Sequence, residues 1–296
     1  MSASYPFVVV DVFTENAYGG NQLAVILDAR ALNERQMQSI AREFNFAEST
    51  FVLPPEDPVH TARVRIFTPR AEMPFAGHPT VGTAAVLMAR HAGMSGTSMT
   101  LEEIVGPIEV TVAPHGRGYS SKLLLKPWVE VPPDRLDPAA VARVLSLPSD
   151  AVQEAWFASV GARFAIARLA SSELVDAAVL DRAQWQQQLA HAWSPHVFFF
   201  AGDPRNDRSL YARMFAPALG IDEDPATGSA VAALAASLAA REAECELVLH
   251  VRQGVQLGRP SDIHARATSR GGALLRVDLV GTSVIVAEGV IEAPRS

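Results

Sequence analysis

Two glycine-containing motifs, about half a chain length apart, have the residue types of a site for a small anion. They are Pro74-Phe-Ala-Gly-His-Pro79 and Pro225-Ala-Thr-Gly-Ser-Ala230, and each precedes an uncharged, alanine-rich run. A glycine at the start of a helix lets a ligand approach free N–H groups, where the helix dipole favours negative charge. The pair predicts carboxylate binding at Gly77, Gly228 and Ser229, in one cleft that both helix starts face. A tight turn without a ligand is the alternative interpretation.

Three further residues carry side chains that could transfer a proton or orient a substrate. Glu48 stands among phenylalanines where a helix gives way to a strand, and partial burial there would raise its pKa toward the range of a general acid or base. His78 falls in the first turn of a helix, which disfavours the imidazolium and suits a neutral hydrogen-bonding role. Asp224 can cap the second helix or orient a substrate amine or hydroxyl. A surface glutamate and two capping residues are the structural alternatives.

An internal repeat indicates how these residues are positioned. Arg65-Ile-Phe-Thr-Pro69 returns as Arg213-Met-Phe-Ala-Pro217, 148 residues later in a chain of 296. A repeat of this period predicts two similar lobes. We expect an N-terminal lobe over 1–126, to which residues from about 285 to 296 can return, and a C-terminal lobe over 127–284. The proline-rich segment 127–148 would connect them.

The hydrophobic pattern predicts the content of each lobe. Most segments are typical of short strands, and several alternate as half-buried strands do. Gly271-Gly272 and Gly281-Thr282 are expected as hairpin turns, and 33–44 as an amphipathic helix. Segments 79–89 and 229–240 are helical in length but carry no charge on any side, so each must be enclosed. The sequence therefore predicts an α+β fold with two pseudo-symmetric lobes, each a barrel-like sheet around a central helix.

Composition excludes several classes of function. A net charge of −7 without a basic stretch argues against nucleic-acid binding. The histidines and the single cysteine show no metal-ligand spacing, and no glycine-rich motif offers a nucleotide cofactor a binding site. The chain shows neither a signal peptide nor a membrane-length apolar run. We expect a cytoplasmic protein without metal, cofactor, nucleic-acid or membrane partners.

Four segments resemble the PhzF family, named for the isomerase of phenazine biosynthesis, and the resemblance covers essentially the whole chain. They are Val10-Asp-Val-Phe13 with Gly20-Asn21, then Asn45-Phe-Ala-Glu-Ser-Thr-Phe51, Gly77-His-Pro-Thr80 and Asp224-Pro-Ala-Thr-Gly-Ser-Ala230. The family fold is similar to that of diaminopimelate epimerase. Two positions depart from the usual family pattern: Gln22 stands where proline is common, and Ala47 where serine is common.

The resemblance implies a cofactor-independent isomerase that moves a proton on a small cyclic carboxylate, as trans-2,3-dihydro-3-hydroxyanthranilate isomerase does. It implies that Glu48 transfers the proton, that His78 and Asp224 are polar site residues, and that Gly77, Gly228 and Ser229 hold the carboxylate. Dimers are common in such families, so a homodimer is expected.

Three other functions remain as alternatives. The first is amino-acid epimerisation, although epimerases of this fold carry catalytic cysteines where this chain has Ala76 and Thr227. The second is hydrolysis of a C–C bond beside a carboxylate with the same glutamate. The third is non-catalytic binding of small carboxylates, which has no need for a general base.

Overall fold

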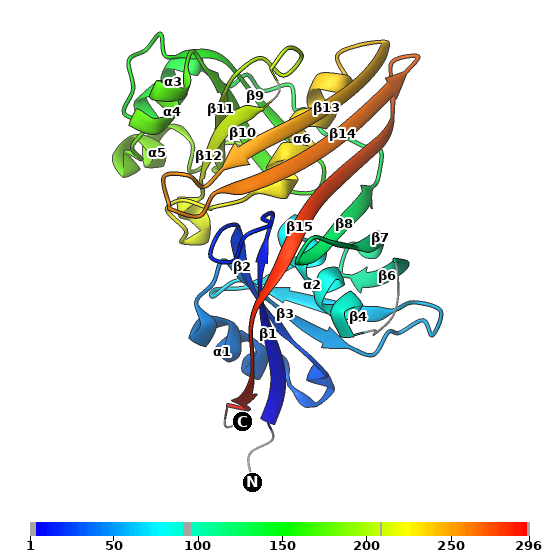
Figure 1. Cartoon of the computed structure of the whole chain (residues 1–296). Coiled ribbons are helices and arrows are strands. Elements are labelled where there is room, and N and C mark those ends of the chain that lie inside the picture. The colour runs from blue at the N-terminus through cyan, green and yellow to red at the C-terminus, as the bar shows by residue number, and fades with distance from the viewer. Residues whose placement is uncertain (1–3, 91–95, 208, 295–296) are drawn as a thin grey trace. The chain divides into compact units, whose positions relative to one another are not determined.

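The computed structural model describes residues 4–90, 96–207 and 209–294 (Figure 1). The chain forms two compact units, each with its own core. Unit 1 consists of Met1–Leu124 and Val280–Ser296, and unit 2 of Leu125–Leu279. The long strand β15 (Ala273–Glu292) begins in unit 2 and ends in unit 1, so the chain returns to its first unit at the end.

Unit 1 is a closed barrel of eight strands. Around the barrel the order is β1, β2, β3, β4, β6, β7, β8 and β15, and pairing of β15 with β1 closes the ring. The barrel strands before β15 are β1 (Ser4–Val12), β2 (Asn21–Ile26), β3 (Glu48–Leu53), β4 (Ala62–Phe67), β6 (Thr97–Glu103), β7 (Gly106–His115) and β8 (Gly118–Leu125). The short strand β5 (Glu72–Met73) pairs with β4 outside this ring.

Helix α2 (Gly77–Arg90) contacts strands from several sides of this barrel and is buried along nearly its whole length. Between His78 and Arg90 its sequence carries no ionisable side chain, which explains the placement, because no face of this stretch requires water. Gly82 lets β1 and β2 approach closely, since a Cβ atom there would lie 2.7 Å from side-chain atoms of Leu23 and Val12. The buried hydroxyl of Thr83 in α2 has a partner on β3, since the hydroxyl oxygens of Thr83 and Thr50 lie 2.9 Å apart.

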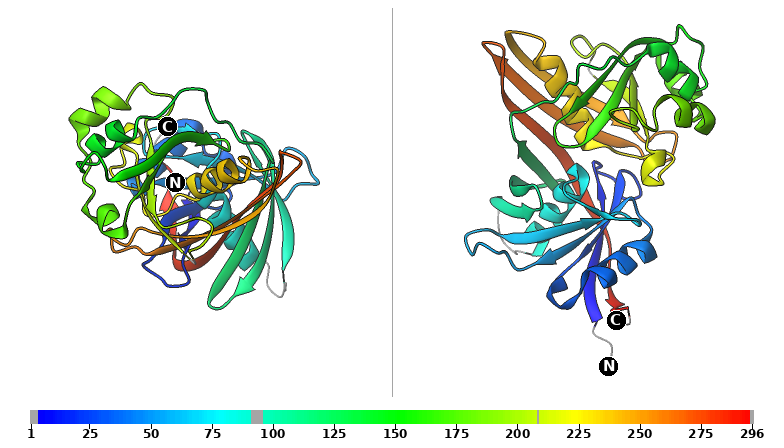
Figure 2. Two further views of the ribbon diagram at one scale, coloured as in Figure 1. Left: turned by 90° about the horizontal axis from the view of Figure 1, so that it is seen from above. Right: turned by 180° about the vertical axis from the view of Figure 1, so that it is seen from behind.

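Helix α1 (Glu34–Phe44) packs on the outer face of the barrel (Figure 2, right) and leads the chain to β3. It starts with a capping box, in which Asn33 and Gln36 exchange side-chain to backbone hydrogen bonds. It ends at Asn45, whose left-handed conformation (φ 52°) reverses the chain direction. Its buried face carries Met37, Ile40 and Ala41, so the helix that the sequence predicted here is confirmed.

Unit 2 is a curved sheet in the order β9, β10, β11, β12, β13, β14 and β15, with α6 (Gly228–Ala239) against β9, β10, β13 and β14. The strands of this sheet before β15 are β9 (Val152–Ser159), β10 (Arg163–Leu169), β11 (Val197–Ala201), β12 (Leu210–Phe215), β13 (Glu244–Gln253) and β14 (Ser261–Arg270). The other helices of unit 2 are α3 (Pro138–Val144), α4 (Ser172–Ala177) and α5 (Arg182–Gln188). Short 3₁₀ turns lie at Ala29–Ala31 in unit 1 and at Pro217–Leu219 in unit 2. Helices α3, α4 and α5 belong to a separate apolar cluster that includes Phe157 and Phe199.

The sequence correctly predicted the α+β class and the two enclosed helices. It was wrong at Gly281-Thr282, where β15 continues as a strand instead of turning. This glycine serves close packing, because a Cβ atom there would lie 2.3 Å from the ring of Phe13. The turn at Gly271-Gly272 is confirmed, and both glycines have positive φ. Within 127–148, expected only as a connection, Pro138–Val144 forms α3, capped by Asp137.

Candidate functional site

The start of α2 in unit 1 presents the first predicted glycine. The helix begins at Gly77, and the carbonyl of Ala76 accepts both the backbone N–H and the hydroxyl of Thr80, at 3.3 and 2.8 Å. The N–H groups of Gly77 and His78 belong to the first turn, where an α-helix supplies no acceptor. This turn therefore has the donors that an anion requires.

His78 is buried at this helix start, with 5% of its surface exposed. Burial lowers the pKa of its imidazole from 6.5 to about 3, against the opposing effect of a hydrogen bond with the backbone of Gln22. The ring is therefore neutral at physiological pH and can act as a hydrogen-bonding group. Gln22 is one of the departures from the family pattern, yet its contact with His78 uses the backbone.

Glu48 is the first residue of β3, and it is 9% exposed. Its Oε2 lies 3.4 Å from Nε2 of His78, and both atoms are shielded from solvent. Because His78 is uncharged, it does not neutralise the glutamate as a cation would. The pair places a carboxyl group beside a neutral imidazole, which is an arrangement that can remove and return a proton.

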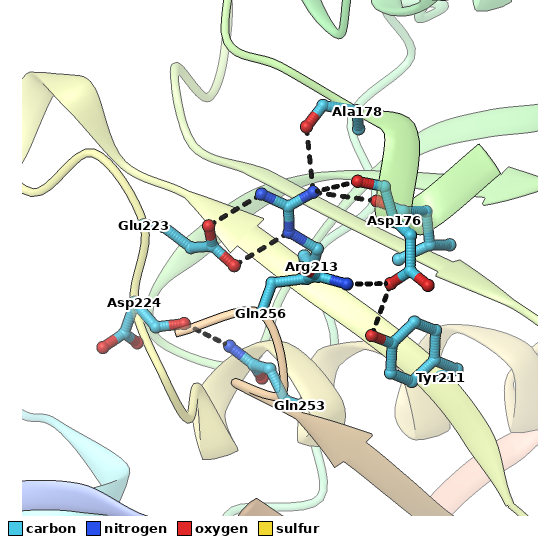
Figure 3. A network of polar contacts seen from close by, with 9 residues as sticks. Asp176, Ala178, Tyr211, Arg213, Glu223, Asp224, Gln253 and Gln256 are labelled. Atoms are coloured by element: carbon cyan, nitrogen blue, oxygen red, sulfur yellow. Dashed lines mark hydrogen bonds and ion pairs between the residues drawn. The ribbon is translucent and has the colours of Figure 1, made fainter. Parts of the chain in front are cut away.

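In unit 2 the residues before α6 are held by a buried glutamine that the sequence analysis missed. Oε1 of Gln253 accepts the backbone N–H of Thr227 at 3.0 Å. Its Nε2 donates to the carbonyl of Asp224 at 2.8 Å, a contact that Figure 3 shows. The Thr227 hydroxyl in turn donates to the Asp224 carboxylate at 2.6 Å. Helix α6 begins at Gly228, which is buried, and Ser229 beside it is partly exposed.

The repeated arginines, Arg65 and Arg213, make the same kind of contact in each unit, a pair of hydrogen bonds to one glutamate carboxylate. Arg65 donates from Nε and Nη2 to both carboxylate oxygens of Glu72, at 2.6 and 2.5 Å. Arg213 binds Glu223 in the same way, with both hydrogen bonds at 2.8 Å (Figure 3). In both cases the paired glutamate lies shortly before the motif that opens the buried helix, so the arginine fixes the approach to that helix.

The structure thus brings Glu48, Gly77 and His78 together in unit 1. In unit 2 it places Asp224 close before Gly228 and Ser229, on one short segment. The described residues contain no group of three or more His, Cys, Asp or Glu side chains arranged to hold a metal ion. Within that same part of the chain, none of the helices combines the length and the apolar character needed to cross a membrane.

Comparison with known proteins decides the family. The family model described as phenazine biosynthesis-like protein, PhzC-PhzF, matches residues 10–289. The chain belongs to the PhzF family. An uncharacterised isomerase of Mesorhizobium japonicum is 37% identical over 295 residues, which cover 96% of this chain and 97% of the relative.

A second relative carries a more specific name. The trans-2,3-dihydro-3-hydroxyanthranilate isomerase of Pseudomonas fluorescens is 36% identical to this PhzF family member, over 96% of this chain and 98% of its own. The crystal structure of a PhzF family protein from Bacillus anthracis aligns with a TM-score of 0.83 at 25% identity, over 98% of this chain and 99% of that one. The resemblance noted in the sequence is therefore confirmed, and the chain is an isomerase of this family.

Proposed function

We propose that this protein is a cofactor-independent isomerase that moves a proton between two carbon atoms of a small cyclic carboxylate, with Glu48 as general acid and base. One observation carries the proposal: the buried Glu48 carboxyl group lies 3.4 Å from the neutral imidazole of His78, at the start of α2. The name of the Pseudomonas fluorescens relative suggests the substrate class, a dihydro-hydroxyanthranilate.

The reaction is balanced without any other reactant. The Glu48 carboxylate takes a C–H proton, the ring double bonds shift, and the carboxylic acid so formed returns the proton to another carbon of the same substrate. Nothing is oxidised or reduced. Because the carboxyl group gains one proton in the first step and gives one up in the second, it suffices for both steps. His78 orients the carboxyl group, while the N–H of Gly77 binds the substrate carboxylate.

The groups of unit 2 enter the proposal with their own roles. Asp224 binds the amine or hydroxyl of the substrate, and its own position is held by Thr227 and Gln253. Gly228 and Ser229 donate to the carboxylate from the start of α6. The homodimer suggested by the resemblance stays a prediction, to be measured by light scattering.

Epimerisation by two opposed bases is disfavoured at the two positions that would need reactive side chains. Ala76 has no ionisable group, and its carbonyl is occupied by Thr80. Thr227 uses its hydroxyl to donate to Asp224. Neither position offers a second base.

The test is turnover of trans-2,3-dihydro-3-hydroxyanthranilate in D₂O by wild type and by Glu48→Gln. We expect an isomerised product, deuterium in that product unless the carboxyl group returns the same proton, and a kcat at least about a hundredfold lower in the variant. Glu43→Gln, an exposed glutamate at the end of α1, is the matched control and should behave as wild type. Full activity of Glu48→Gln would contradict the proposal, and cleavage products would favour C–C hydrolysis.

A further inference from the structure

A second buried acid, Glu103, lies against the first turn of α2 and belongs to neither of the two glycine-containing motifs. Glu103 is the last residue of β6 and is 7% exposed. On this strand the buried positions alternate, and Glu103 continues the inward-facing series of Met99 and Leu101. Its Oε1 lies 2.6 Å from the hydroxyl oxygen of Thr80, and that oxygen lies 2.8 Å from the carbonyl oxygen of Ala76.

These two contacts determine where the protons are. The Thr80 hydroxyl has a single hydrogen, and the Ala76 carbonyl can only accept. The Thr80 hydroxyl can give each contact a full two-centre hydrogen bond only if Glu103 is protonated and donates to Thr80, which then donates to Ala76. Burial favours this state, since it raises the pKa of Glu103 from 4.5 to about 8.

We propose that Glu103 is a positioning residue that, as a neutral acid, keeps the Thr80 hydroxyl on the Ala76 carbonyl and thereby strengthens the Gly77 N–H as a donor to the substrate carboxylate. Ala76 and Gly77 share one peptide group, so a hydrogen bond to its carbonyl polarises its N–H in the same direction. This inference rests on the proposed function for the role of Gly77. It adds a residue that touches no substrate.

The cationic side chains near Glu103 form their ion pairs with other carboxylates, and not with Glu103. A cavity of about 410 Å³ is lined by Glu103 and by charged side chains of β4, β6 and the loop before β4. Its cations pair with other acids: Arg63 with Glu56, Arg65 with Glu72 and Glu34, and His60 with Glu102. Asp57, also in the lining, donates its backbone N–H to Glu102.

Helix α2 contacts Glu103 through an uncharged group, the hydroxyl of Thr80. The first of its ionisable residues is His78, which is neutral, and the next is Arg90 at the far end. The second carboxyl oxygen of Glu103 is buried and makes no hydrogen bond within the described residues. A neutral carboxylic acid fits these surroundings, whereas a carboxylate would lack compensation.

Ionisation of Glu103 should therefore change the helix start. The carboxylate accepts the Thr80 hydrogen, and the Ala76 carbonyl then keeps only the longer hydrogen bond from the Thr80 backbone, 3.3 Å. The Gly77 N–H becomes a weaker donor. Substrate carboxylate binding should decline as pH rises through the pKa of Glu103, about 8.

The amide resonance of Gly77 reports this directly. In full-length protein labelled with ¹⁵N-glycine, we expect the Gly77 proton shift to titrate with a midpoint near pH 8 in wild type. Glu103→Gln supplies a permanent donor to Thr80, so the shift should stay near its low-pH position. Thr80→Val removes the link, so the shift should move upfield and lose its titration. An unchanged titration in either variant would overturn the proposal.

Affinity for 3-hydroxyanthranilate, measured by calorimetry at pH 7, is the second readout. We expect Thr80→Val to weaken binding roughly fivefold, the value of about one neutral hydrogen bond, and KM to rise with kcat nearly unchanged. Glu103→Leu should weaken binding similarly, and Glu103→Gln should restore it. Thr83→Val, which removes another buried hydroxyl from α2, is the matched control and should bind as wild type. Equal losses in Thr80→Val and Thr83→Val would contradict the proposal.

The two proposals fail separately. If Glu48→Gln keeps full activity, the proposed function is wrong, although a Gly77 titration abolished by Glu103→Gln would still support the link between Glu103 and the helix start. If Glu48→Gln is inactive and the Gly77 shift is independent of Glu103, only the positioning role is wrong.

Discussion

Arg213 holds Glu223 through two parallel hydrogen bonds, from Nε and Nη2, each 2.8 Å long. Its remaining nitrogen, Nη1, donates to the backbone carbonyls of Val175 and Ala178 at 2.9 and 2.8 Å. Both side chains of the ion pair are about nine-tenths buried. Because Glu223 directly precedes Asp224, this pair fixes the segment that carries one of the proposed site residues.

The first prediction is that Arg213→Lys destabilises the protein. Lysine cannot form the planar two-point contact with Glu223, and it leaves the carbonyls of Val175 and Ala178 with fewer donors. Losing a hydrogen bond to a charged group costs roughly 2 kcal/mol, so the midpoint of urea unfolding should fall clearly. Arg205→Lys is the control, because its ion pair with Glu242 is nearly half exposed and should contribute little. Equal stability of the two variants would show that the Arg213 pair has no special role.

The second prediction concerns Gln253, which is fully buried. Gln253→Leu has a similar size but loses the hydrogen bonds to Asp224 and Thr227, so the segment before α6 should become less ordered. We expect KM for the substrate to rise roughly tenfold, with a smaller loss in kcat, because binding geometry suffers before the proton transfer does. Gln256→Leu is the control: Gln256 is exposed and contacts Asp176 instead (Figure 3). A KM equal to wild type in Gln253→Leu would refute the positioning role.

The two central helices were predictable because the absence of charge is a local property of the sequence. A helix such as α6, which carries no charge on any side, is stable in a folded protein only when other elements bury it. The repeat of Arg65 and Arg213 was also visible, but its purpose was not. Their partners Glu72 and Glu223 lie at different spacings, 7 and 10 residues away, so neither pair has a recognisable local signature.

Residues that act over longer sequence distances escaped prediction for the same reason. Gln253 holds Thr227 from 26 residues away, and Glu103 reaches Thr80 across 23 residues. Both contacts exist only because a strand packs against the start of a central helix. Glu103 did leave one signal: it is an acid at a position where the alternation of β6 calls for an inward-facing residue.

The third prediction tests the close approach of α2 to the barrel. Gly82→Ala adds a Cβ atom that would lie 2.7 Å from atoms of both Leu23 and Val12, so the helix or the strands must shift. Such overpacking typically costs about 1–3 kcal/mol, although alanine favours helix formation over glycine. We expect a lower Tm by differential scanning calorimetry. A variant as stable as wild type would mean that β1 and β2 yield more easily than the packing suggests.

The last prediction concerns His78 and acid stability. Burial lowers the pKa of the folded-state imidazole to about 3, while the unfolded chain keeps a value near 6.5. Between these pH values the unfolded state binds more protons, so the free energy of unfolding falls as pH falls below 6.5. His78→Asn removes this contribution and should flatten the dependence of unfolding free energy on pH between 7 and 5, measured by urea titration. His115→Asn, at an exposed histidine, should leave the slope as in wild type. An identical slope in His78→Asn and wild type would show that His78 is protonated with its ordinary pKa, and its proposed role as a neutral partner of Glu48 would then fail as well.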